Sequence, residues 1–145
     1  MSKNNQFKFN LLVTILFSLN SVNVYSQTEL VKGADVFNFK CEDIDILNSK
    51  NEKIGSGSGY SIFVTSKEGK ASFIDNKGIK YNMTFHEKGA VSSTNFSWGY
   101  GDGEKLTSQN YVSLIKNNNT NKIILMHTKK NGTEIKEKVF YFKCS

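Results

Sequence analysis

Arginine and proline are absent from this chain, and cysteine and histidine occur only twice each. All 19 basic residues are therefore lysines, and they stand against 13 acidic residues for a formal net charge of +6. Arginine is the side chain best suited to bidentate contacts with phosphates and base edges, so its absence argues against a nucleic-acid partner. The lysines are also scattered, with Lys129 and Lys130 the only adjacent pair. We therefore read the positive charge as ordinary solubilising charge.

Long apolar runs are missing as well, apart from the segment Leu11–Leu19 near the N-terminus. This run is too short to span a bilayer, which takes about 20 residues. Two lysines precede it, and the small residues Val24 and Ser26 take the −3 and −1 positions of a cut before Gln27. This pattern resembles bacterial export leaders and predicts a secretory signal peptide over residues 1–26. We expect the mature chain to work in the periplasm or outside the cell, with no membrane span after leader removal.

The chain has no C-x-x-C motif, which removes the usual redox and zinc interpretations of its two cysteines. In an exported chain, an even number of cysteines predicts a disulfide, here between Cys41 and Cys144. The flanking residues repeat, because Phe37–Cys41 and Phe140–Cys144 both read F-x-F-K-C. As strands, each segment would place its two phenylalanines and its cysteine on one face. We expect the two strands to be neighbours.

The mature chain, residues 27–145, has the size of a single domain and shows no convincing helix. Short β-rich runs alternate with turn signals, at the spacing typical of a barrel or a sandwich. Seven strands are predicted, at Phe37–Cys41 with a continuation through Ile46, Tyr60–Thr65, Ala71–Asp75, Ile79–His86, Tyr111–Lys116, Lys122–Thr128 and Thr133–Cys144. An eighth strand is an option between Ala90 and Tyr100, and the Gly- and Ser-rich part of Asn48–Gly59 is expected to be a flexible loop.

Short connections favour an up-and-down antiparallel meander. With seven strands, the first and the last would run in the same direction, lie side by side and be joined by the disulfide. We therefore expect an all-β domain that forms a closed or nearly closed barrel. A β-sandwich is the alternative.

The sequence contains no recognisable catalytic or metal-binding pattern. No nucleophile–base pair can be assembled, so we expect no catalytic residue, no cofactor and no enzymatic activity. His86 lies on the polar face of its predicted strand, and His127 shares the phase of Ile123 and Leu125. Two histidines on distant strands are weak evidence for a metal site. We expect His86 to lie at the surface and His127 to be partly buried.

The most unusual segment begins at Phe96 and reads FSWGYGDG. As a strand, it carries Phe96, Trp98 and Tyr100 on one face and small residues on the other. One interpretation is a core strand whose glycines accommodate a neighbour. The other is an aromatic platform, with Trp98 and Tyr100 as ligand-binding residues. The function we expect is a non-enzymatic binding module for a small ligand or a saccharide. The alternative is an envelope or secreted interaction or inhibitor protein that uses a surface to bind a protein partner.

Overall fold

The computed structural model describes residues 35–145, so the predicted signal peptide and the cut before Gln27 lie outside the described residues. The described part forms one antiparallel sheet of nine strands. In chain order they are β1 (Asn38–Asn48), β2 (Lys53–Gly57), β3 (Ser61–Thr65), β4 (Lys70–Ile74), β5 (Lys80–Ala90), β6 (Asn95–Gly101), β7 (Asn110–Asn117), β8 (Ile123–Asn131) and β9 (Glu134–Cys144). The described residues contain no helix that could span a membrane.

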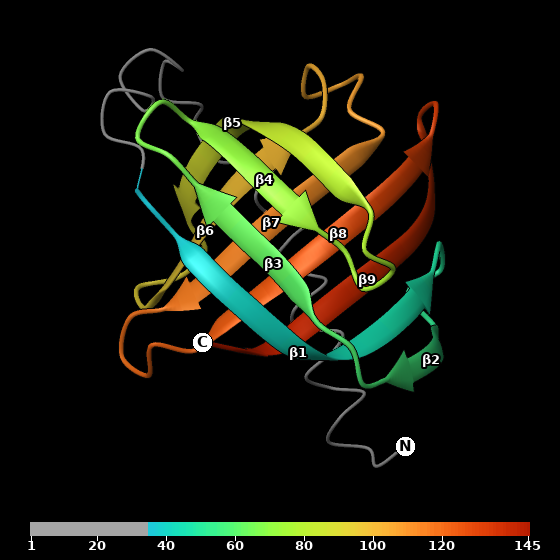
Figure 1. Cartoon of the computed structure of the whole chain (residues 1–145), viewed down its shortest axis with the longest axis horizontal. Coiled ribbons are helices and arrows are strands. Elements are labelled where there is room, and N and C mark those ends of the chain that lie inside the picture. The colour runs from blue at the N-terminus through green and yellow to red at the C-terminus, as the bar shows by residue number, and fades with distance from the viewer. Residues whose placement is uncertain (1–34) are drawn as a thin grey trace.

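The sheet closes on itself, because β1 pairs with β9 as well as with β3. β1 pairs with β3 along its first part, Asn38–Cys41, and with β2 along its second part, Ile44–Leu47. On its opposite edge, β1 pairs with β9. Strands β1 and β3–β9 thus form a closed eight-stranded barrel, and β2 lies beside the end of β1 (Figure 1). The all-β antiparallel barrel is confirmed, and the sandwich alternative is not.

The structure settles one open point of the predicted strand pattern and corrects two others. The optional eighth strand exists as β6, which is paired on both sides with β5 and β7. The Gly- and Ser-rich segment is not a free loop, because Lys53–Gly57 forms β2 against β1. With an even number of barrel strands, β1 and β9 run antiparallel and not in the same direction.

Side chains fill the barrel interior. Its largest fully buried residues include Phe63, Phe73, Tyr100 and Tyr141. Their rings meet edge to face, with centroids 5.2 Å apart for Phe63 and Tyr100 and 5.8 Å apart for Phe73 and Tyr141. Such pairs add specific geometry to the burial of large apolar surfaces. The aromatic residues are therefore the main core of the domain.

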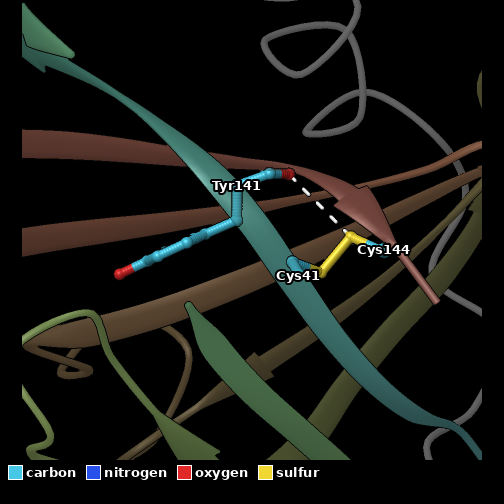
Figure 2. Close-up of a disulfide and its surroundings, with 3 residues drawn as sticks. All are labelled: Cys41, Tyr141 and Cys144. Atoms are coloured by element: carbon cyan, nitrogen blue, oxygen red, sulfur yellow. Dashed lines mark hydrogen bonds between the residues drawn. A yellow bond between two sulfur atoms is a disulfide. The ribbon is translucent and has the colours of Figure 1, made fainter. Parts of the chain in front are cut away.

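The Cys41–Cys144 disulfide is confirmed and joins the strands where the barrel closes (Figure 2). The two cysteines are cross-strand partners, with Cα atoms 3.9 Å apart and a sequence separation of 103. Beside the bond, the carbonyl oxygen of Tyr141 lies 4.0 Å from Cys144 Sγ. A disulfide is compatible with an oxidising compartment outside the cytoplasm.

The two F-x-F-K-C segments differ in the way they face the barrel. Phe37 and Cys41 join the interior cluster as expected, but Phe140 and Phe142 belong to a second cluster. In β9, Tyr141 points inward, so its neighbours Phe140 and Phe142 point outward. Lys143 then has φ 51°, and the register shifts between β1 and β9, which returns Cys144 to the inner side. The expectation that both segments place all three residues on one face was wrong for the second segment.

Candidate functional site

The predicted ligand-binding residues Trp98 and Tyr100 both lie among interior side chains. Trp98 is 6% exposed, and its indole Nε1 donates to Oδ2 of Asp35 at 2.9 Å. The ammonium of Lys88 also binds this carboxylate at 2.9 Å and lies 5.2 Å from the indole ring. Tyr100 is fully buried, and its ring meets Phe63 and Phe85. The platform role of this pair stays a prediction, and a ligand there would have to displace Asp35.

The glycines of β6 make room for side chains of neighbouring segments. A Cβ atom on Gly99 would overlap the hydroxyl of Tyr111, and one on Gly101 would lie 2.7 Å from His86 Nε2. The His86 and Tyr111 rings are stacked, with centroids 6.0 Å apart. The close approach that glycine indicates in a strand is therefore made by the protein itself.

His86 differs from its expected position at the surface, since it is only 6% exposed. A bulge between Phe85 and Glu87 interrupts the pairing of β5 with β6, and the ring packs against Gly101 and Tyr111. Burial lowers the pKa of His86, in spite of a backbone hydrogen bond to Gly103 that raises it. The prediction of a surface histidine was wrong, because the bulge and the segment after β6 enclose the ring.

Polar groups converge at the opposite end of the barrel from Trp98. Three connections meet there, namely the β4–β5 turn, the β6–β7 loop and the β8–β9 hairpin. We call this region the polar end, and it consists of Asp75, Tyr81, Asn110, His127 and the ion pair of Lys129 with Glu137. The ion pair has an Nζ–Oε1 distance of 2.9 Å. Its two residues are cross-strand partners two positions beyond His127 and Val139, on the same face of the sheet.

Asp75 organises the β4–β5 turn at this end. It is 1% exposed, and its Oδ1 accepts from the backbone amides of Lys77 and Ile79 at 2.9 Å each. Its Oδ2 accepts from the hydroxyl of Tyr81 at 3.1 Å. The turn therefore holds a buried carboxylate whose second oxygen fixes a half-buried tyrosine. Side-chain to backbone bonds of this kind are the usual reason for aspartate in turns.

His127 lies beneath Tyr81 at the polar end and is fully buried. Its ring meets those of Phe73 and Tyr81 edge to face, with centroids 5.0 Å and 5.1 Å away. Nε2 of His127 lies 3.0 Å from Oδ1 of Asn110. The other ring nitrogen, Nδ1, is buried and has no hydrogen-bond partner within the described residues. An unpartnered buried polar atom costs about 1–3 kcal/mol and is uncommon in native structures.

The electrostatic environment keeps this imidazole neutral. Burial is the main cause that lowers the pKa of His127 to about 3, and Lys129 adds to the shift. Asp75 and Asp102 act in the opposite direction without overcoming it. Burial and the nearby Asp75 raise the pKa of Tyr81 to about 12, so its hydroxyl stays protonated. At neutral pH the polar end thus holds a buried neutral imidazole and a half-buried neutral phenol between charged groups.

The chemistry of this arrangement is hydrogen bonding. A neutral imidazole nitrogen with a free lone pair accepts a hydrogen bond from a hydroxyl or an amide. Among residues 35–145, no group of three or more His, Cys, Asp or Glu side chains is placed to hold a metal ion. In this arrangement, a few fixed polar groups lie around an aromatic ring.

Comparison with known proteins identifies no family for this chain. No protein-family model matches the chain, and no curated protein matches its sequence.

Sequence reasoning gave His127 the phase of the apolar residues Ile123 and Leu125 and expected it to be partly buried, whereas it is fully buried, and the rest of the polar end was missed. Asn110 and Asp102 are single polar residues on either side of a loop, and only the pairing of β7 with β8 brings Asn110 beside His127. A local signal existed for Asp75, which precedes the turn sequence Asn76–Gly78.

Proposed function

We propose that the mature chain is an exported, non-enzymatic binding module that holds a small neutral ligand, such as a saccharide, at the polar end of its barrel. The observation that carries this proposal is the buried Nδ1 of His127, which has a lone pair and no partner within the described residues. A ligand hydroxyl that donates to this atom would remove the cost of the unsatisfied group.

The neighbours of His127 fit the same class of ligand. Tyr81 is half-buried and contributes an aromatic ring. The carboxylate of Asp75 lies next to Tyr81, and the amide of Asn110 lies next to His127. Saccharides combine apolar ring faces with many hydroxyl groups, so a site with one aromatic ring and a few fixed polar groups is suited to them. The interior of this eight-stranded barrel is filled by side chains, so the ligand would lie at the end of the barrel.

The covalent structure supports a location outside the cytoplasm. The disulfide joins cysteines 103 positions apart, and bonds of this kind persist in oxidising compartments. Together with the predicted leader over residues 1–26, it favours the periplasm or the extracellular medium.

A protein-interaction or inhibitor role is the second candidate. It is favoured by the outer apolar cluster, in which Leu47, Met126 and Phe140 pack with Ile124 and Phe142. These side chains have the outward phase of their strands, yet the first three are at most 6% exposed. Because these three side chains are already buried, the cluster exposes little apolar surface, and the ligand-binding function is preferred.

Calorimetric titration of the mature chain, residues 27–145, with neutral mono- and disaccharides tests the proposal. We expect at least one of them to bind, and His127→Phe to abolish the binding because the acceptor atom is lost. His86→Phe is the matched control, since it changes the other histidine on the outside of the wall, and it should leave the affinity unchanged. Equal affinities for the wild type and His127→Phe would contradict the proposed site. The absence of binding by any saccharide would contradict the proposed function.

A further inference from the structure

The hydrogen bonds around Asn110 determine which ring nitrogen of His127 carries the proton. Oδ2 of Asp102 lies 2.8 Å from Nδ2 of Asn110. A carboxylate oxygen only accepts, so the amide NH2 of Asn110 must face Asp102. The amide oxygen then faces His127, and it too only accepts. Nε2 of His127, 3.0 Å away, must therefore be the donor.

Asp102 is held firmly enough to impose this direction. Its other oxygen, Oδ1, accepts from the backbone amides of Gln109 and Asn110 at 2.9 Å and 3.1 Å. These bonds fix the carboxylate across the two ends of the β6–β7 loop. The chain of bonds therefore runs from His127 through Asn110 to Asp102.

The consequence lies on the far side of the imidazole ring. A neutral imidazole has one protonated nitrogen, so a proton on Nε2 leaves Nδ1 with a lone pair only. Nδ1 is buried, and the hydroxyl of the nearby Tyr81 is already donated to Asp75. The positive charge of Lys129 is paired with Glu137. An anion at Nδ1 would meet a lone pair, with the carboxylate of Asp75 close to the ring.

We propose that Asp102 and Asn110 are positioning residues that make the His127 site accept hydrogen bonds only, so that it selects a neutral hydroxyl or amide donor and rejects carboxylates. This inference rests on the proposed function, because it names the class of ligand for the same site. A site built to accept a hydrogen bond discriminates strongly against a group that cannot donate one, since buried polar atoms would be left unpaired.

The isosteric variant Asp102→Asn provides a direct test. The new amide keeps its oxygen for the two backbone donors, so its NH2 faces Asn110. The Asn110 amide must then turn over and present its own NH2 to His127. Nε2 becomes an acceptor, and the proton moves to Nδ1, which turns the site into a donor. Asp43→Asn is the control, because Asp43 lies beside the disulfide and pairs with Lys143 at the other end of the barrel.

The experiment uses the mature chain labelled with ¹⁵N at histidine, in which chemical shifts distinguish protonated from bare ring nitrogens. The probes are glucose and its carboxylate analogue glucuronate. We expect Nε2 to be protonated in the wild type and in Asp43→Asn, and Nδ1 to be protonated in Asp102→Asn. The wild type should bind glucose at least about tenfold more tightly than glucuronate, and Asp102→Asn should lose or reverse this preference.

The outcomes separate the inference from the proposed function. A proton on Nδ1 in the wild type, or an unchanged tautomer in Asp102→Asn, would overturn the positioning role even if glucose binds. If the tautomers are as expected but Asp102→Asn keeps the wild-type preference for glucose over glucuronate, the claim of selectivity is overturned. If neutral sugars and their acids bind to none of the proteins, the proposed function fails, and the selectivity fails with it.

Discussion

At the scale of single residues, His127 connects the candidate site with the stability of the fold. The ring is held neutral inside the barrel, where burial lowers its pKa to about 3, whereas an unfolded histidine titrates near 6.5. Between these values the unfolded chain binds the proton and the folded chain does not. The contribution of His127 to stability is therefore complete above about pH 6.5 and is lost as the pH falls toward 3, at up to ~1.4 kcal/mol per pH unit.

This pH dependence can be measured by urea unfolding at pH 7, 6 and 5. Asp75, Asp102 and Lys129 face His127 and remain in every variant, so replacement of the histidine isolates its share. We expect His127→Gln to lose less stability between pH 7 and pH 5 than the wild type loses. The same series on His86→Gln separates the contribution of the second histidine, whose pKa burial also lowers. Identical pH slopes for the wild type and His127→Gln would show that the imidazole is not buried as a neutral group.

Gly99 supports a second prediction at this scale. Its outer side is covered by Tyr111, so Gly99→Ala should destabilise the domain by about 1–3 kcal/mol through overpacking. Gly57→Ala in β2 is the matched control, because a Cβ atom there meets nothing within 4 Å. Its expected effect is within about 0.5 kcal/mol. Thermal melts of the two variants side by side check this, and equal melting temperatures would contradict the close contact.

At the scale of the elements, the pairing of β1 with β9 is what makes the sheet a barrel. It joins strands that are far apart in the sequence, and the disulfide connects them at one end. Closing so long a loop in the unfolded chain removes much of its conformational entropy. We expect the double variant Cys41→Ala with Cys144→Ala to lose about 2–5 kcal/mol and several degrees in melting temperature.

Non-reducing mass spectrometry of the wild type should find Cys41 and Cys144 linked to each other. Comparison of the reduced wild type with the double variant separates the loss of the bond from the loss of the side chains. A wild type that melts at the same temperature with and without reductant would mean that the bond does not stabilise the barrel.

The sequence predicted most of these elements from local patterns, and its errors arose where pairing partners decide the structure. The alternation around Met83 identified β5, and the two cysteines identified β1 and β9 as neighbouring strands. Neither β2 nor the direction of β9 relative to β1 follows from local pattern. β2 depends on pairing with the second part of β1, and the direction of β9 depends on the number of barrel strands. The outward turn of Phe140 depends on the register shift near Lys143, a backbone feature that alternation alone does not reveal. The candidate site was missed for the same reason, since Asn110 and His127 meet only through the register of β7 with β8.

At the scale of the whole molecule, the proposed function needs an exported chain. We expect cleavage between Ser26 and Gln27, with the mature protein recovered from the periplasm or the medium. N-terminal sequencing of the purified protein checks this prediction. Recovery of the chain with Met1 intact in the membrane fraction would contradict it.

The two ends of the barrel differ, so a single measurement can locate the ligand. Trp98 and Asp35 close one end, and Tyr81 and His127 lie at the other. The measurement is a map of backbone amide chemical shifts of residues 27–145 during titration with the neutral saccharide that binds best. We expect the largest changes at Tyr81, Asn110 and His127. Changes centred on Trp98, or on the outer apolar cluster around Phe140, would contradict this expectation.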